Sequence, residues 1–242
     1  MSEFKIPTEV VELPSKGLIY SEDNPLSSGK VEIKYMTARE EDILTNKSYI
    51  ENNTTMDKLL ESVVVSNINL DDLVLGDKDA LLVSTRILGY GKDYSFYRNN
   101  EEVNVDLSTL ENAKFDESLI TKGKNEFEFE LPHSSNKITF KLLTVKDTKE
   151  IDKELKGLNK VNKNFSPELS TRLKYIITSI NGEEDKKTIR EFVDKALLAR
   201  DSRALRNHIN KVKPKVDLTY QLDSGEETAI PIGVGFFWPD TV

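Results

Sequence analysis

The chain contains no cysteine among its 242 residues. This absence excludes disulfides, cysteine-ligated zinc, iron–sulfur clusters and catalysis by a thiol. Histidine is almost as scarce, because only His133 and His208 are present and they lie in unrelated sequence contexts. A histidine-based metal site or a Ser-His-Asp triad therefore has little material to be built from. The sequence predicts no metal site and no cofactor.

Long apolar runs are lacking as well. No stretch approaches the roughly 20 apolar residues that span a bilayer, so no membrane partner is expected. The N-terminus, MSEFKIPTEVVEL, is acidic and has no apolar core of the kind found in secretory signals. With 37% hydrophobic and 31% charged residues, the composition is typical of a soluble globular protein of one large domain or two small ones.

The formal net charge of −8 is unevenly distributed. Residues 146–215 hold 18 Lys/Arg against 11 Asp/Glu, a net charge of +7, whereas the rest of the chain holds 16 against 31, a net charge of −15. Such asymmetry can orient a charged partner. Lysine and glutamate alternate here at helical spacing, which favours a solvated helical face. Nucleic acid is not an expected partner, because no aromatic residues are interleaved with the basic ones.

Alternating apolar and polar residues predict antiparallel strands. The pattern occurs in GKVEIKYM (29–36), in DYSFY with VNVDL, in EFEFEL (126–131) with KITFKLL (137–143), and in VDLTYQL with TAIPIGVGFFW. Strands and helices are segregated along the chain and do not alternate as βαβ units. The predicted fold class is therefore α+β, with antiparallel β-hairpins, a segregated helical block and mixed connectivity.

Helix starts are marked by capping residues. Thr37-Ala-Arg-Glu40 has the spacing of a capping box, and DKDALLVSTRILGYG predicts an amphipathic helix that ends at a glycine. The polar stretch KSYIENNT is expected as a loop. A further helix is expected from Pro167 through LSTRLKYIITSI, and Asp201 or Ser202 is expected to cap the last long helix.

Four segments follow from these patterns. Residues 1–28 are expected as an extended N-terminal arm, 29–145 as an α+β domain with antiparallel hairpins, 146–215 as a helical block, and 216–242 as a C-terminal β-hairpin that packs back on the domain.

The arm contains the stretch ELPSKGLIY, whose PSKG core raises the question of a phosphate loop or a Ser-Lys catalytic pair. The Gly-x4-Gly-Lys-Ser/Thr spacing of a P-loop is absent. Ser15 and Lys16 are adjacent, so in an extended chain their side chains point in opposite directions. We interpret PSKG as a turn at the hinge of the arm, with Leu13 on one side and the segment 18–20 on the other.

The C-terminal stretch GVGFFWPD contains Gly-x-Gly and the only tryptophan, Trp238. A nucleotide site is not expected, because packing of the apolar side chains in the core accounts better for this stretch. Alternation predicts a strand that packs on its own chain, although aromatic residues also dominate interface hot spots. The candidate partner-binding residues along the chain are Leu13, Pro14, Lys16, Tyr20, Arg203, Arg206, Phe236, Phe237 and Trp238.

Acidic residues occur in adjacent pairs, such as Asp71 and Asp72. Glycosidase and metal chemistry need carboxylates that converge in a cleft, and adjacent side chains diverge. In ARDSRALRNHI, capping and intrahelical pairs account for the charges. The sequence therefore predicts no catalytic residues and no enzymatic activity.

Several whole phrases of the sequence resemble the baseplate hub proteins of T-even-type contractile-tailed phages. They are LPSKGLIY, GKVEIKYMTAREEDILTN, LLVSTRILGYGKDY, KGKNEFEFELP with KITFKLLT, STRLKYIITSINGEEDKKTIREFV, LLARDSRALRNHI and VGFFWPD. The resemblance runs in order from about residue 12 to 240. It implies a non-enzymatic role in building the central hub of the tail baseplate through contacts with other baseplate proteins, and it supplies no catalytic residues.

The resemblance leaves two roles open, a structural hub subunit and a transient assembly chaperone that is absent from the finished virion. The expected location is the host cytoplasm during assembly, and the virion baseplate if the chain is a subunit. Self-association is a further candidate contact. The alternatives from other classes are a hydrolase, which needs a pocket with converging polar groups, and a DNA-contacting tail protein, which predicts steeply salt-dependent binding by residues 146–215.

Overall fold

The computed structural model describes residues 5–99, 101–161, 167–222 and 225–237. Helices and small antiparallel sheets make up this part of the chain, which confirms the predicted α+β class. The helices are α1 Ala38–Leu44, α2 Lys47–Glu51, α3 Thr55–Val63, α4 Leu75–Tyr90, α5 Val145–Val161, α6 Glu168–Ile176, α7 Lys186–Lys195, α8 Ala199–Val212 and α9 Val234–Phe237.

The strands form separate small sheets. They are β1 Thr8–Glu12, β2 Lys30–Lys34, β3 Asp93–Arg98, β4 Glu101–Asp106, β5 Phe127–Glu130, β6 Lys137–Phe140, β7 Ile177–Ile180, β8 Thr219–Gln221 and β9 Glu227–Ala229. The sheet orders are β1-β2, β3-β4, β5-β6-β7 and β8-β9, and every pairing is antiparallel. In β5 the alternation predicted from the sequence is confirmed, since Phe127 is buried and Glu128 and Glu130 are exposed.

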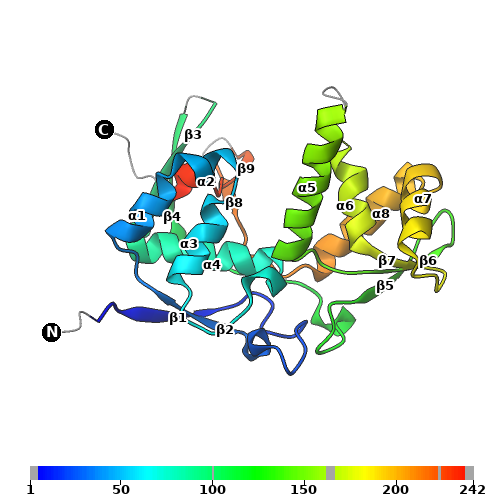
Figure 1. Cartoon of the computed structure of the whole chain (residues 1–242), viewed down its shortest axis with the longest axis horizontal. Helices are drawn as coiled ribbons and strands as arrows, with labels where there is room; N and C mark the ends of the chain where they lie inside the picture. Colours follow the sequence, from blue (N-terminus) through cyan, green and yellow to red (C-terminus); the bar gives the residue numbers. More distant parts are fainter. Residues whose placement is uncertain (1–4, 100, 162–166, 223–224, 238–242) are drawn as a thin grey trace.

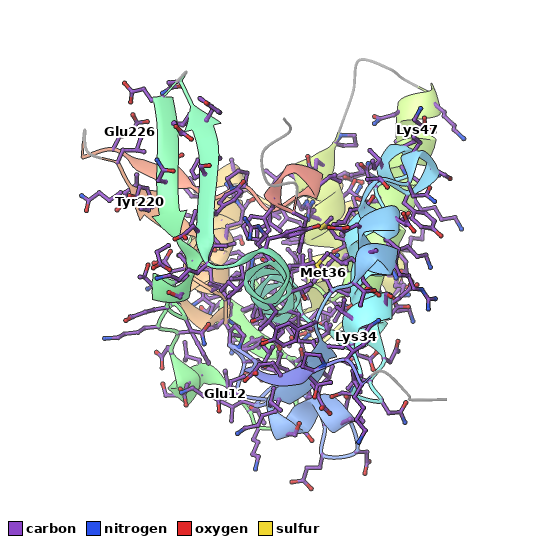
Figure 2. The ribbon with its side chains drawn as sticks, turned by 90° about the vertical axis from the view of Figure 1, so that its left-hand side faces the viewer. Glu12, Lys34, Met36, Lys47, Tyr220 and Glu226 are labelled. Carbon is purple, nitrogen blue, oxygen red and sulfur yellow. The ribbon has the colours of Figure 1, made fainter. Side chains whose placement is uncertain are left out.

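The elements are arranged in two groups beside the long helix α4 (Figure 1). One group contains α1 to α3 with β1 to β4, and the other contains α5 to α8 with β5 to β7. After α8 the chain returns to the first group as β8, β9 and α9. In Figure 2 the C-terminal hairpin, marked by Tyr220 and Glu226, lies on the same side of the molecule as β3 and β4. One cluster of buried apolar side chains runs through both groups and includes Leu81, Phe140 and Phe236.

The first 28 residues do not form a free arm in the part that the structure describes. Residues 8–12 are extended as β1, and five apolar side chains of the segment are buried in the core: Val11, Leu13, Ile19, Tyr20 and Leu26. The PSKG turn is confirmed as a turn. Gly17 there has a φ of +77°, and a Cβ would lie 2.3 Å from the Ser27 carbonyl oxygen. Only glycine combines this backbone conformation with this close approach.

Three predictions of secondary structure were wrong. Residues 177–180, expected as helix, form β7 and pair with β6, because Ile-Thr-Ser-Ile has β-branched residues that suit a strand. Residues 47–51, expected as loop, form α2, with the Asn46 side chain accepting a hydrogen bond from Tyr49 N–H. The C-terminal strand ends at Ala229, and residues 234–237 form the short helix α9.

The capping predictions had mixed outcomes. The Thr37–Glu40 capping box of α1 is present. Asp201, however, does not cap α8, which begins at Ala199. Its carboxylate accepts hydrogen bonds from the backbone N–H groups of His133 and Ser134, at 2.9 and 3.0 Å. The acid therefore joins α8 to the β5–β6 turn.

Candidate functional site

A groove of about 610 Å³ lies between the turn that joins α2 to α3 and one face of α5. Lysines dominate its lining. On α5 they recur at intervals of four, three and four residues, which places them on one face of the helix. They are Lys149, Lys153, Lys156 and Lys160, joined by Lys78 from α4. The carboxylates in the lining are Asp57 and Asp152, so the lining is net positive.

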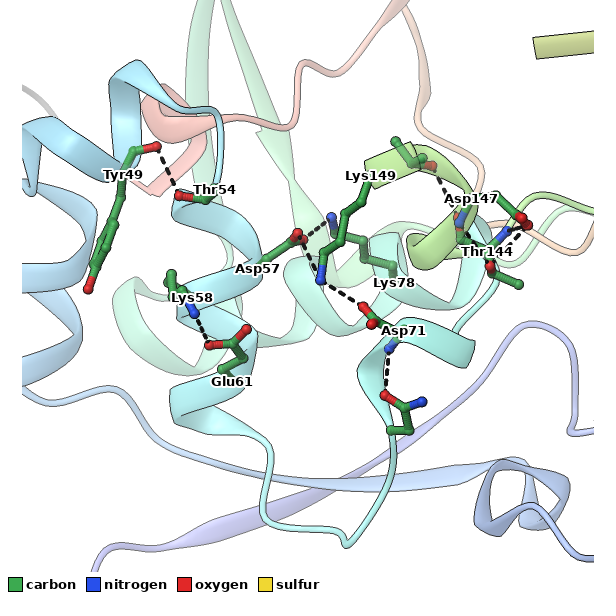
Figure 3. Close-up of polar contacts among 12 residues, drawn as sticks. Tyr49, Thr54, Asp57, Lys58, Glu61, Asp71, Lys78, Thr144, Asp147 and Lys149 are labelled. Carbon is green, nitrogen blue, oxygen red and sulfur yellow. Dashed lines mark hydrogen bonds and ion pairs between the residues drawn. The ribbon is translucent and has the colours of Figure 1, made fainter. Parts of the chain in front are cut away.

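The inner end of the groove is neutralised by ion pairs (Figure 3). Lys78 Nζ lies 2.5 Å from Asp57 Oδ1, and Lys149 Nζ lies 2.7 Å from Asp71 Oδ1 and 3.7 Å from Asp57 Oδ2. Burial by itself lowers the pKa of Lys149, but the hydrogen bond that Lys149 donates to Asp71 and the negative charge of Asp57 outweigh it and raise that pKa. These pairs fasten α3, α4 and α5 together and shape the floor of the groove.

At the outer end of the groove the lysine side chains are exposed to solvent and their charge is not neutralised by ion pairs among the described residues. Lys153 and Lys160 are exposed and take part in no ion pair among the described residues. Lys156 Nζ is 3.5 Å from the Asn52 carbonyl oxygen on the opposite wall. Solvated ammonium groups of this kind attract carboxylates and other anions to a surface and fix their register. No aromatic side chain lines the described groove, so it offers no platform for stacking a base.

A smaller cavity of about 160 Å³ lies where α4 meets α6 and α8. Its lining includes Lys141, which is paired with Asp147 at 2.6 Å, and Arg172, which is paired with Glu168 at 3.1 Å. No carboxylate, imidazole or hydroxyl group belongs to this described lining. The described lining therefore offers no hydroxyl–imidazole or carboxylate pair.

The predicted partner-binding residues of the N-terminal segment have different environments. Leu13, Pro14 and Tyr20 are buried within the chain itself, so they present no surface here. Lys16 is exposed, and its Nζ lies 2.6 Å from Glu117 Oε1. Ser15 is buried, and its hydroxyl donates a hydrogen bond to Asp77.

The C-terminal candidates are also held by the chain. Phe236 and Phe237 are 1% and 0% exposed, and Phe236 packs edge to face on Tyr94 with 4.9 Å between ring centroids. Trp238 lies outside the described residues. Arg203 and Arg206 are exposed on α8 and do not line the groove. Arg203 and Arg206 lie three residues apart on α8, but the described candidates as a set do not form one exposed surface.

Sequence reasoning missed a buried polar cluster around Asp77, at the start of α4. Its carboxylate accepts hydrogen bonds from Ser15 N–H at 2.9 Å, from Ser15 Oγ at 2.6 Å and from the Tyr20 hydroxyl at 2.6 Å. Burial raises the pKa of Asp77, and these hydrogen bonds only partly oppose it. The available signal was spacing, since Asp77, Leu81 and Thr85 share the apolar face of a helix.

A second missed residue is Arg86, on the same helix. Its guanidinium is buried and donates hydrogen bonds to the carbonyl oxygens of Phe236, Gly91 and Asp93, at 2.8, 2.8 and 3.1 Å. It therefore ties α9 to the end of α4 and to β3. Arg86 lies four residues after Leu82, which again places it on the apolar face.

Glu40 joins β2, α1 and α3. Its fully buried carboxylate receives hydrogen bonds from Lys34 Nζ at 2.9 Å, from the Ser62 hydroxyl at 2.6 Å and from Thr37 N–H at 2.8 Å. Burial raises the pKa of Glu40, but the hydrogen bonds from Lys34, Ser62 and Thr37 outweigh it and lower the pKa from 4.5 to about 2. Only the capping half of this arrangement could be predicted.

We expect Glu40 to make the fold sensitive to acid. Because its folded pKa is depressed, its contribution is present above the unfolded pKa of 4.5 and is lost as the pH falls toward about 2. Glu40→Gln is expected to lower the free energy of unfolding by about 1–3 kcal/mol at neutral pH. The free energy of unfolding of this variant should also fall less steeply as the pH is lowered. Urea unfolding at a series of pH values measures this, with the exposed Glu51→Gln as control. If the free energy of unfolding falls equally steeply with acid in Glu40→Gln and in the native chain, the prediction is contradicted.

Among the described residues, no helix is both long and apolar enough to serve as a membrane span. The same residues contain no group of three or more histidine, aspartate or glutamate side chains placed to hold a metal ion. Comparison with protein-family models, curated proteins and solved structures finds no match to this chain.

Proposed function

We propose that this chain is a non-enzymatic assembly protein of the tail baseplate hub of a contractile-tailed phage, acting by binding other baseplate proteins. The sequence phrases that resemble hub proteins support the phage role. The feature of the structure that supports a binding role is the groove, whose outer lysines, Lys153 and Lys160, are exposed. A protein with a net charge of −8 that keeps such a surface is suited to a partner with a complementary acidic surface.

Mass spectrometry of purified virions, beside affinity purification of the tagged chain from infected cells, tests this function. We expect baseplate proteins to co-purify with the chain. Stoichiometric presence in virions then makes it a hub subunit, and absence from virions makes it an assembly chaperone. Failure to recover any baseplate protein, together with absence from virions, contradicts the proposal.

We expect charge reversal in the groove to weaken this co-purification. The double variant Lys153→Glu with Lys160→Glu is expected to reduce recovered baseplate proteins at least tenfold, because repulsion replaces attraction at the contact. The matched control is Lys186→Glu with Lys187→Glu, which changes the charge equally at exposed positions of α7 outside the groove. Equal recovery with both double variants contradicts a role for the groove.

A further inference from the structure

β1 is the open edge of its small sheet. Two hydrogen bonds frame its pairing with β2, from Tyr35 N–H to Pro7 O at 3.0 Å and from Leu13 N–H to Gly29 O at 2.8 Å. On the β1 side these bonds are made by the odd-numbered residues Pro7 and Leu13. Successive residues of a strand direct their backbone N–H and C=O groups to opposite sides. The backbone groups of the even-numbered residues therefore face away from β2. Continuing this alternation, they belong to Ile6, Thr8, Val10 and Glu12.

The opposite edge of the sheet, formed by β2, is covered by residues 64 and 65. Val65 N–H donates to the Glu32 carbonyl oxygen at 2.9 Å, and Val64 forms an isolated bridge with Ile33. Among the described residues, β1 pairs with β2 alone. Figure 1 shows β1 along the lower margin of the molecule. An unpaired edge of this kind is a template for another strand.

The side chains of this edge are unusually apolar for solvent-facing positions. Ile6 is 41% exposed and Val10 is 54% exposed, and Thr8 between them is also exposed. In an extended chain these three side chains lie on one face. A strand added here would cover both apolar side chains while it pairs the free backbone groups.

The side chains along this edge are complementary to those of a second β1 strand, so a second copy of the chain fits as the added strand. In an antiparallel pair centred on Thr8, each Ile6 lies opposite Val10 of the other copy, and Glu9 lies opposite Pro7. No like charges then face each other, and both exposed apolar residues pack across the interface. A pair centred on Glu9 would instead place the Glu9 carboxylates of the two copies opposite each other, and their like charges would repel.

We propose that two copies of the chain associate through their β1 edges, antiparallel and centred on Thr8. The pairing joins the two β1-β2 sheets into one continuous sheet across a twofold axis. It uses only groups of this chain and is independent of the baseplate proposal.

A cysteine cross-link tests the register, and the absence of native cysteine leaves no background. In a hydrogen-bonded antiparallel pair the Cα atoms lie about 5.5 Å apart, within the range of a disulfide. Thr8→Cys is therefore expected to yield a covalent dimer on mild oxidation. In the control Val10→Cys, the two cysteines lie four residues apart along the strands, about 13 Å. This variant is therefore expected to stay monomeric. Cross-linking of Val10→Cys as fast as Thr8→Cys overturns the proposal.

Sedimentation of the native chain over a range of concentrations tests the association itself. We expect a reversible dimer whose dissociation constant rises at least ~10-fold in Val10→Pro, since two backbone hydrogen bonds are lost. Proline is tolerated here because the Val10 N–H faces away from β2. Val65→Lys, which removes an exposed valine outside the edge, should leave the dimer unchanged. A native chain that stays monomeric at every concentration, or a Val10→Pro dimer of native affinity, overturns the proposal.

Discussion

Arg86→Ala is expected to lower the free energy of unfolding by about 3–5 kcal/mol. The side chain is 3% exposed, and its removal leaves the carbonyl oxygens of Phe236, Gly91 and Asp93 without their charged donor. A buried acceptor that loses its partner costs about 1–3 kcal/mol, and the vacated volume adds a packing term. Arg86→Met fills most of that volume, so it isolates the lost hydrogen bonds and should cost less than Arg86→Ala.

The measurement is urea unfolding combined with hydrogen exchange of residues 233–237. Release of α9 predicts faster exchange at the Phe236 amide, which donates to Gly233 O at 3.1 Å, even in conditions where Arg86→Met is still folded. Arg39→Ala, an exposed arginine of α1, serves as control and should change stability by less than about 0.5 kcal/mol. Native stability in Arg86→Met would mean that packing alone holds α9.

Asp77→Ala is expected to cost about 2–4 kcal/mol, the second large effect. It leaves the Ser15 N–H, the Ser15 hydroxyl and the Tyr20 hydroxyl buried without their acceptor. Part of this cost is offset, because the variant no longer buries a polar carboxyl group. The three donors all belong to the N-terminal segment, so the variant should loosen residues 13–20 from α4.

Asp77 should also carry the opposite pH dependence to Glu40. Its folded pKa is raised, so its stabilising contribution is complete below the unfolded pKa of 3.8 and declines as the pH rises. Relative to the native chain, the loss in Asp77→Asn should therefore be larger near pH 4 than near pH 7. Urea unfolding at the two pH values measures this, with the exposed Asp42→Asn as control. An equal loss at both contradicts the assignment.

The hairpins were predictable because their signal is local. Alternation along β5 and β6 places one set of side chains against the core, and Phe127 and Phe140 are indeed partners, with ring centroids 5.2 Å apart. The capping box of α1 was equally local, since its two hydrogen bonds join residues three apart. Such elements depend on neighbours in sequence, and a pattern of a few residues is enough to specify them.

Two of the three errors occurred where distant residues decide the conformation. Residues 177–180 continue an apparent helix in sequence, but β6 offers them strand partners, and the tertiary pairing prevails over helical continuity. The C-terminal aromatics alternate like a strand, yet Arg86 and Tyr94 hold them as α9. Neither partner could be identified from the local pattern.

The candidate groove was predictable in composition but not in shape. The basic character of residues 146–215 was evident, as was the helical spacing of lysine along α5. Which lysines are neutralised was not, because Asp57 and Asp71 come from segments more than 70 residues away from Lys149. The open edge of β1 likewise follows from what covers β2 and what does not.

By itself the sequence determined the α+β class, the hairpins and their buried faces, the lack of thiol chemistry and the basic character of the helical block. Those properties follow from composition and short-range periodicity, which act between residues close in the chain. The tertiary structure alone decided which polar groups are buried, since Ser15, Asp77 and Tyr20 meet across about 60 residues. It also decided which charges and which strand edge stay exposed, because exposure depends on what the rest of the chain covers.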